Sequence, residues 1–345
     1  MAIESKRRQT LKALVAGYAG IAGGMWGTSS ASAQDKAAVD VTFTLDFTTL
    51  GRHAPWYVAL GKGYFKDAGL NVKIIPGQGT AQAIQALESD IAQFAFSDVV
   101  SLTLARARGA STARFLAMNY QSAPYAIFSL VQGANVTTPA KLTGLEVATG
   151  AGSFTPKVVQ GFMKQQRLDP ASIKFVNVDA AARVGMLLTG KVQSIENFIF
   201  AQVGLERAVP PGQLATLLLA DHGLEFYANG ILAKDAFLKA SPDVARAFVK
   251  ASLQGWRDTI ADPEGAATLL ARYVQGLNRD VVVGEIKLLS ALAQNASTRQ
   301  HGLGWIDAGR MKTSLDFIAQ NIGITGTAPA SSDLYSLDFL PRVPA

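Results

Sequence analysis

Side chains that could hold a small molecule follow the first apolar run of this sequence. Asp46 and Phe47 close the run Val41–Phe47, and His53 comes shortly after it. At the carboxyl end of a strand in an open α/β sheet, such groups lie where ligands bind. His53 also precedes Pro55 at the start of a predicted helix, so it is either a hydrogen-bonding ligand contact or a cap, and both interpretations stay open.

Two glycine-rich turns could present backbone N–H groups to the same molecule. Gly77-Gln78-Gly79-Thr80 precedes a predicted helix, so Gln78 and Thr80 lie where a helix start favours an anionic or carbonyl oxygen. A tight turn that simply needs glycine explains the pattern equally well. Gly150–Phe154 repeats the pattern, with Ser153 as a donor. It is not a nucleotide-binding P-loop, since no Gly-Lys-Ser/Thr follows.

Glu196 interrupts the apolar run Ile195–Phe200. An unpaired carboxylate there would be costly if it were buried, so it needs a partner. The partner is either a basic group of the ligand or a neighbouring cation, Arg183 or Lys191, because buried charges are usually paired. We predict the ligand contact and keep the salt bridge as the alternative.

Four aromatic residues are predicted at the edges of the same site: Phe47, Tyr120, Tyr125 and Phe154. Rings on both sides suit a flat ligand ring held between them. A small anion would instead require an arginine, and we identify no arginine that qualifies. The pattern therefore favours an aromatic ligand.

The residue types needed for covalent or metal chemistry are scarce. The sequence has no cysteine, and its three histidines, His53, His222 and His301, lie too far apart for a local metal motif. No Ser-His-Asp order and no paired catalytic carboxylates stand out. We predict a protein that is not an enzyme and that holds no metal and no cofactor. Half of the formal net charge of +6 lies in the first 33 residues, so the remainder does not indicate nucleic acid.

Residues 1–33 are typical of an export signal. Lys6, Arg7 and Arg8 precede the apolar run Ala13–Trp26, and Ala31-Ser32-Ala33 forms a small-residue cleavage site. The paired arginines resemble a twin-arginine signal, although Lys6 and Thr10 depart from that pattern. A general secretory signal is the alternative. No later segment reaches 18 apolar residues without charge, so we expect a soluble periplasmic protein with no membrane insertion of the mature chain.

The remaining chain alternates short apolar runs with longer helical patterns, which predicts an α/β protein with parallel sheets covered by helices. Trp56 and Tyr64 share a helix face and are predicted core residues. Three helices follow residue 240, and the tail after Ile324 is expected to wander over the surface. Predicted strands are 41–47, 72–75, 94–96, 125–131, 145–149, 173–178 and 194–200, with 223–232 extended.

Two extended crossings divide the chain into two predicted lobes. Lobe 1 comprises residues 34–128 and 229–345, and lobe 2 comprises residues 129–228. Lobes joined by extended strands can rotate about a few backbone dihedrals. We therefore expect a hinge of two crossover strands that closes the lobes around a ligand.

Several stretches, in this order and spacing, resemble the solute-binding subunits of bacterial ABC importers. The group includes binders of thiamine-pyrimidine precursors, riboflavin, nitrate, sulfonates and taurine. The resemblance spans about residues 41–262 and is specific to the superfamily. The stretches are His53–Leu70, Pro76–Thr80, Phe96-Ser-Asp98, Leu104–Gly109, Ser122-Ala-Pro-Tyr125, Leu187–Lys191 and Asn229-Gly230.

The resemblance implies a type II periplasmic-binding-protein fold, a monomer, and an importer permease with its ATPase as partners. Asp98 and Ser122 lie in two of the resembling stretches and join the predicted site. Similar proteins place a carboxylate close to the position of Glu196 to meet a ring nitrogen or an amine. The implied ligand is an aromatic heterocycle, such as a thiamine-related pyrimidine or a flavin-like ring.

Other functions are compatible with the same resemblance. The ligand could be a sulfonate or an aromatic carboxylate, and the chain could be a sensing subunit that delivers its ligand to a receptor. Fungal pyrimidine synthases of thiamine biosynthesis share this fold, but they carry a cysteine-rich segment that this sequence lacks.

Overall fold

A computed structural model describes residues 37–150 and 153–341 of the protein. The predicted export signal, residues 1–33, lies outside these described residues, as do two residues of the predicted Gly150–Phe154 loop. The export signal therefore stays a prediction. In the part that is described, no helix is long and apolar enough to cross a membrane.

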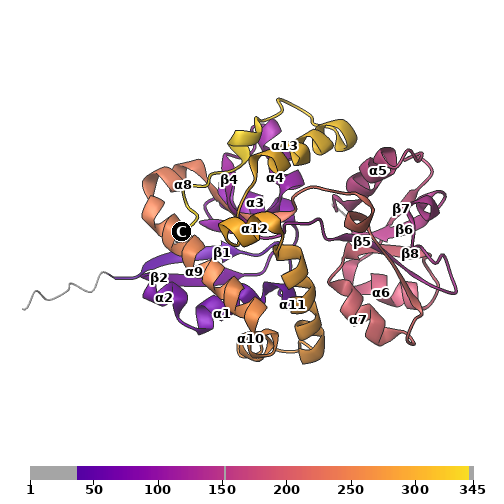
Figure 1. Ribbon diagram of the computed structural model, residues 1–345, viewed down its shortest axis with the longest axis horizontal. Helices are drawn as coiled ribbons and strands as arrows, with labels where there is room; N and C mark the ends of the chain where they lie inside the picture. The colour runs from indigo at the N-terminus through magenta and orange to yellow at the C-terminus, as the bar shows by residue number, and fades with distance from the viewer. Residues whose placement is uncertain (1–36, 151–152, 342–345) are drawn as a thin grey trace, which may run out of the picture. The chain divides into compact units, whose positions relative to one another are not determined.

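The first sheet has five strands in the order β2-β1-β3-β10-β4 (Figure 1). β1 pairs in parallel with β2 and with β3, whereas β10 pairs antiparallel with both β3 and β4. The strands are β1 (Val39–Thr44), β2 (Leu70–Ile75), β3 (Phe94–Asp98), β4 (Ala113–Met118) and β10 (Asn229–Lys234).

The second sheet repeats this arrangement in the order β7-β6-β8-β5-β9. β6 is parallel to β7 and β8, and β5 is antiparallel to β8 and β9. The strands are β5 (Tyr125–Leu130), β6 (Glu146–Thr149), β7 (Lys174–Asn177), β8 (Ser194–Phe198) and β9 (Leu214–Leu218).

The prediction of parallel sheets is wrong for one strand of each sheet. Parallel neighbours need a crossover connection, usually a helix, that brings the chain back to the starting edge. β5 and β10 instead arrive directly from the other sheet through extended connections, so they enter antiparallel. β4 and β9 were absent from the sequence prediction. The boundaries of the two lobes and the hinge stay predictions.

Helices pack on both sheets (Figure 1). Asp98 accepts a hydrogen bond from the Ser101 amide at the start of α4, and Asp262 accepts one from the Gly265 amide at the start of α10. The helices before β10 are α1 (Ala54–Gly61), α2 (Tyr64–Asp67), α3 (Thr80–Glu88), α4 (Val99–Ala107), α5 (Thr155–Gln165), α6 (Ala180–Leu188) and α7 (Ala201–Ala208), with the short 3-10 turn η1 (Gly51–His53) before α1. Those after it are α8 (Asp235–Ala240), α9 (Pro242–Ala261), α10 (Pro263–Leu270), α11 (Arg279–Ala293), α12 (Ala296–His301) and α13 (Ala308–Phe317), followed by η4 (Ile318–Ile322) and η5 (Ser331–Leu334).

An aromatic core joins the first sheet to α1 and α9. Trp56 of α1 lies 5.1 Å from Phe43, 4.6 Å from Phe96 and 5.5 Å from Trp256, measured between ring centroids. All four side chains are buried, so Trp56 is a core residue as predicted. Aromatic side chains of this size each bury about 150–250 Å². This packing fixes α1, and with it the turn η1 that precedes it, against the sheet.

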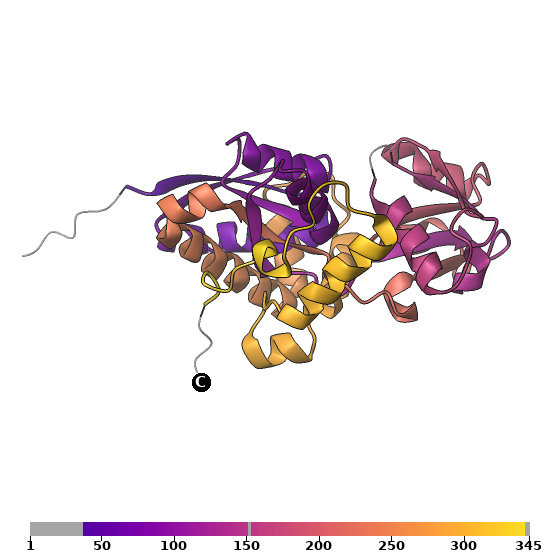
Figure 2. The same ribbon diagram turned by 90° about the horizontal axis from the view of Figure 1, so that it is seen from above.

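The C-terminal tail does not wander over the surface, contrary to prediction. Leu334 is fully buried, and the Ser336 amide donates to the Phe115 carbonyl oxygen of β4 at 2.9 Å. The tail thereby covers an edge strand, whose free N–H and C=O groups would otherwise stay unpaired. The yellow segment before it, α13 and η4, reaches the second sheet's helices, where η4 packs on α5 (Figures 1 and 2).

Gly255 of α9 permits the close approach of α1. A Cβ atom at this position would collide with the Pro55 carbonyl oxygen and lie 2.8 Å from the Ala59 Cβ atom. Gly255→Ala should therefore lower the free energy of unfolding by about 1–3 kcal/mol. Gly185→Ala in α6, where a Cβ atom would meet nothing within 4 Å, should raise it by about 0.5–1 kcal/mol. Urea unfolding of both variants measures the contrast, and equal shifts would contradict it.

Candidate ligand-binding site

The antiparallel crossing strands bring their first residues to the carboxyl ends of the parallel strands. Asn229, the first residue of β10, lies opposite Asp98 at the end of β3. Tyr125, the first residue of β5, lies opposite Phe198 at the end of β8. Each sheet therefore gathers polar and aromatic side chains from several chain segments at one edge, which is where ligands bind in α/β sheets.

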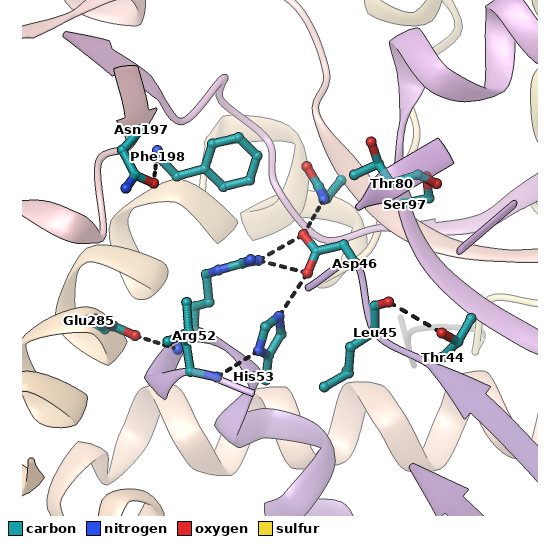
Figure 3. A network of polar contacts seen from close by, with 12 residues as sticks. Thr44, Leu45, Asp46, Arg52, His53, Thr80, Ser97, Asn197, Phe198 and Glu285 are labelled. Carbon is teal, nitrogen blue, oxygen red and sulfur yellow. Dashed lines mark hydrogen bonds and ion pairs between the residues drawn. The ribbon is translucent and has the colours of Figure 1, made fainter. Parts of the chain in front are cut away.

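Asp46, two residues after β1, is the centre of a buried hydrogen-bond network that we call the Asp46 network, made of Asp46, Arg52, His53 and Asn229. Figure 3 shows Asp46, Arg52 and His53 of this network. Arg52 Nη1 donates to both carboxylate oxygens at 3.0 and 2.8 Å. Asn229 Nδ2 donates to Oδ2 at 2.9 Å, and His53 Nε2 lies 2.8 Å from Oδ1. Both carboxylate oxygens of Asp46 are therefore hydrogen-bonded within the protein.

The ionised form of Asp46 is strongly favoured despite its burial. Burial alone would raise the pKa of this carboxyl group, but the Arg52 charge and the His53 hydrogen bond outweigh it and lower the pKa to about 2. The side chain is therefore a carboxylate at any physiological pH. It forms a buried ion pair with Arg52, whose pKa is raised, burial being outweighed by the Asp46 charge.

His53 is neutral and its tautomer is determined by its neighbours. Nδ1 accepts a hydrogen bond from the Leu50 amide at 3.0 Å, so Nε2 carries the proton and donates it to Asp46. Burial and the Arg52 charge lower the pKa of His53 to about 4. Both ring nitrogens are thus engaged within the protein, and the imidazole makes no cap bond to α1.

Arg52 was missed by the sequence analysis, and the expectation that no arginine belongs to the site is wrong. Its guanidinium carbon lies 5.3 Å from the ring centroid of Phe198, the last residue of β8 (Figure 3). It also lies 5.9 Å from the ring centroid of Phe200, two residues further along the chain. The Tyr120 hydroxyl is close enough for the Arg52 charge to act on its pKa. The signal was present in the sequence, since Arg52 adjoins the predicted site residue His53.

The predicted aromatics Tyr120 and Tyr125 meet this arginine through two phenylalanines. Phe198 lies 5.4 Å from Tyr125, and Phe200 lies 5.5 Å from Tyr120, between ring centroids. Tyr120 also packs edge-on against Phe96 of the aromatic core. Both tyrosines are buried. Phe198 and Phe200, whose ring centroids lie 5.3 and 5.9 Å from the Arg52 guanidinium carbon, thus link it to both tyrosines.

Glu285 of α11 holds the backbone of η1. Its Oε2 atom accepts a hydrogen bond from the Arg52 amide at 3.0 Å (Figure 3). A Cβ atom at Gly51 would lie 2.8 Å from the same oxygen, so only glycine allows this approach. Burial raises the pKa of Glu285 to about 6, although the Arg52 charge opposes the shift. Carboxyl groups with perturbed pKa values are concentrated at functional sites.

Asp98 is a second buried carboxyl group in the first sheet. It accepts hydrogen bonds from the Ser101 amide at 2.7 Å and the Ser101 hydroxyl at 2.8 Å, and Thr80 Oγ1 lies 2.8 Å from that hydroxyl. Burial raises its pKa, because these partners are neutral donors rather than cations. The predicted residues Thr80 and Asp98 are thus joined through Ser101.

Glu196 forms the predicted alternative, the salt bridge. Arg183 Nη1 lies 3.0 Å from its Oε1 atom, and the Thr149 hydroxyl donates to the same atom at 2.9 Å. The cluster lies at the carboxyl end of β6, beside Gly150. The salt bridge does not decide whether Glu196 also contacts a ligand, so that role stays a prediction.

The remaining predicted site residues differ in their burial and in their contacts. Phe47 is half-buried and its carbonyl oxygen accepts from the Gly77 amide, whereas Gln78 is exposed. The Ser153 hydroxyl accepts from the Thr155 amide at the start of α5. Phe154 packs against buried hydrophobic side chains, and Ser122 lies half-buried between β4 and β5.

Carboxylates from both sheets act on one residue. Burial raises the pKa of the Tyr125 hydroxyl well above its usual value, and the charges of Asp98, Glu196 and Asp46 raise it further. Asp46 and Asp98 belong to the first sheet's side and Glu196 to the second sheet, so charges from both sheets act on Tyr125. Whether these four residues contact a ligand stays a prediction. Among the described residues, no group of three or more histidine or acidic side chains could hold a metal ion.

A family model described as NMT1/THI5 like matches residues 51–266, which includes η1, both crossing strands and Glu196. The chain belongs to this family. The stretches quoted from the sequence lie mostly within the matched range, so the predicted resemblance is confirmed.

Proteins that are similar to this chain include binding proteins and enzymes. The riboflavin-binding protein RibY of Chloroflexus aurantiacus is 24% identical, with 87% of this chain and 86% of RibY covered. The 4-amino-5-hydroxymethyl-2-methylpyrimidine phosphate synthase THI11 of Saccharomyces cerevisiae is 23% identical, with 70% of this chain and 73% of the synthase covered.

The fold is also that of known solute-binding proteins. The alkanesulfonate-binding protein SsuA from Xanthomonas axonopodis pv. citri, bound to MOPS, matches with a TM-score of 0.66 over 87% of this chain and 98% of SsuA, at 14% identity. The predicted type II periplasmic-binding-protein fold is therefore confirmed.

The neutral state of buried His53 makes stability depend on pH. The pKa is about 4 in the folded chain against 6.5 for an unperturbed histidine, so the unfolded chain takes up the proton first as the pH falls. The stabilisation is complete above pH 6.5 and is lost as the pH falls toward 4. His53→Gln keeps a donor for Asp46 and an acceptor for Leu50 but cannot titrate. Between pH 7.5 and 5, the unmodified protein should lose about 2 kcal/mol more unfolding free energy than the variant.

Urea unfolding at the two pH values measures this difference. Equal losses in the two proteins would show that His53 takes up its proton as readily in the folded chain as in the unfolded chain. Other titrating groups, including Glu285, are present in both proteins and cancel in the comparison.

Proposed function

We propose that this protein is an exported solute-binding protein that captures a small organic molecule between its two lobes and presents it to an ABC importer. The observation that carries the proposal is the meeting of buried polar and aromatic side chains from both sheets around Arg52 and Tyr125. A site built from two sheets that are joined by two extended connections suits capture by hinge closure. Closure is then favoured by the ligand's higher affinity for the closed state.

Binding rather than catalysis is supported by the state of the polar groups. A general base needs a free lone pair, but His53 uses both ring nitrogens within the protein. Asp46 is saturated by its neighbours, and the sequence has no cysteine to act as a nucleophile. The relationship to the yeast synthase makes an enzyme the alternative, but no catalytic group is available in the Asp46 network.

The ligand we propose is an aromatic nitrogen heterocycle. Phe198 and Phe200 add two rings to the predicted aromatic residues, and Asp98 supplies a carboxyl group that only neutral donors bind. N–H groups on a heterocycle would meet such an acceptor. A sulfonate or an aromatic carboxylate is the second candidate, and Arg52 is the residue that favours it.

Export completes the proposal. Residues 1–33 direct the chain out of the cytoplasm by the twin-arginine or the general secretory route. The mature protein then acts as a periplasmic monomer whose partners are the importer permease and its ATPase. A sensing subunit would bind its ligand in the same way and differs only in the receptor that it contacts.

Isothermal titration of the purified protein tests the proposal with three compounds: riboflavin, 4-amino-5-hydroxymethyl-2-methylpyrimidine and MOPS. One of the heterocycles should bind with a dissociation constant in the micromolar range or below, about −8 kcal/mol or stronger. Solution scattering should show a smaller radius of gyration in its presence. Absence of binding by all three compounds, or turnover of the pyrimidine, would refute the proposal.

Glu196→Gln should weaken binding of the heterocycle several-fold, because the charged acceptor for a ring N–H becomes a neutral amide. Arg183→Gln breaks the same salt bridge from the other side but leaves the acceptor in place. If Glu196 contacts the ligand, Glu196→Gln loses more affinity than Arg183→Gln at comparable thermal stability. Equal affinities for the two variants would limit Glu196 to its salt bridge.

A further inference from the structure

Arg52 has more hydrogen-bond donors than the Asp46 network uses. A guanidinium carries five N–H groups, and Nη1 uses its two on the Asp46 carboxylate. The three on Nε and Nη2 donate to no carboxylate or carbonyl oxygen of residues 37–150 and 153–341. The Tyr120 hydroxyl lies nearby and can accept one of them.

Burial makes these remaining donors significant. The Arg52 side chain is only 5% exposed, and Phe198 and Phe200 cover it from the second sheet. Nε and Nη2 of Arg52 are not among the fully buried atoms that lack a partner, so this edge of the guanidinium keeps some access to solvent. A ligand that brings acceptor oxygens to this place would replace that solvent, and the neighbouring rings would shield the new hydrogen bonds from competing water.

The neighbours of Arg52 hold its guanidinium in one orientation. Asp46 holds Nη1, His53 holds Asp46, and Glu285 holds the Arg52 backbone amide. A guanidinium is planar, so fixing Nη1 and the backbone also fixes the direction of the opposite edge. Such support is what a binding group needs if it is to meet a ligand in one geometry.

The charges around Arg52 indicate which acceptors it meets. Its single positive charge is matched by Asp46, and Glu285 adds a second carboxyl group that acts on it. The immediate surroundings therefore have no excess positive charge with which to hold an oxyanion. An uncharged acceptor, such as a ring carbonyl oxygen, suits this environment better.

We propose that Arg52 is the specificity-determining residue of the site, and that its free guanidinium edge donates to the carbonyl oxygens of an uncharged, planar heterocycle. The ligand is thus a lactam or imide ring rather than an aminopyrimidine without carbonyl groups or a sulfonate. Its N–H groups are the natural partners of the Asp98 carboxyl group, which only neutral donors bind. This inference rests on the proposed function and narrows its ligand class.

Arg52→Lys tests the inference, because lysine keeps the charge but loses the planar pair of donors. Lumichrome is the probe, since it is an uncharged ring with two carbonyl groups and no sugar chain. Isothermal titration should show at least a tenfold loss of affinity relative to the unmodified protein. Arg114→Lys, which changes another ion-paired arginine of the first sheet, is the control and should bind within twofold of the unmodified protein.

Three outcomes separate this inference from the proposed function. Tighter binding of MOPS or of 4-amino-5-hydroxymethyl-2-methylpyrimidine than of lumichrome overturns the inference and leaves the proposed function standing. An unchanged affinity of Arg52→Lys for lumichrome also overturns the inference and leaves the proposed function standing. If riboflavin, lumichrome, MOPS and 4-amino-5-hydroxymethyl-2-methylpyrimidine all fail to bind the unmodified protein, the proposed function and the inference are refuted together.

A second measurement serves if Arg52→Lys does not fold, as judged by circular dichroism. A crystal structure of the unmodified protein with lumichrome should place a ring carbonyl oxygen within about 2.7–3.2 Å of Nε or Nη2 of Arg52. A complex in which the carbonyl groups point away from Arg52 refutes the inference without any variant.

Discussion

The buried Asp46 carboxylate is the constraint on which the rest of the site depends. Removing such a charge from water is costly unless hydrogen bonds and a counter-charge replace the lost hydration. Arg52, His53 and Asn229 provide these, and they come from the turn after β1 and from the crossing strand β10. The need to satisfy one carboxylate therefore ties the two segments together and places a guanidinium in front of Phe198 of the second sheet.

The same geometry explains why the two sheets have matching strand orders. In each sheet, a strand that arrives from the other sheet runs antiparallel to its neighbours and starts at their carboxyl ends. Tyr125 and Asn229 reach the site in this way. α11 adds a further connection, because Glu285 holds η1 while the neighbouring Gly284 packs on Val203 of α7. Movement of one sheet relative to the other would thus act directly on the backbone of Arg52.

The family includes binding proteins and synthases on one fold, so the fold by itself does not decide between them. In this chain the polar groups of the Asp46 network are committed to one another. The His53 imidazole has no free nitrogen, and the Asp46 carboxylate accepts hydrogen bonds at both oxygens. Arg52 keeps N–H groups for which no partner is found among the described residues, which suits recognition of a ligand.

The sequence by itself determined the α/β class and most strands and helices, because apolar periodicity is a local property. It also predicts Asp46, Asp98, Tyr125 and Glu196 as site residues from their positions near strand ends, and that assignment stays a prediction. It could not supply the direction of β5 and β10 or the packing of the tail, since both depend on which strand edges remain free after the sheets assemble. Only the tertiary structure revealed that Asp46 and His53 orient Arg52. That arrangement depends on burial and on partners that are distant along the chain. Asn229 lies 183 residues after Asp46, and Glu285 lies 233 residues after Arg52.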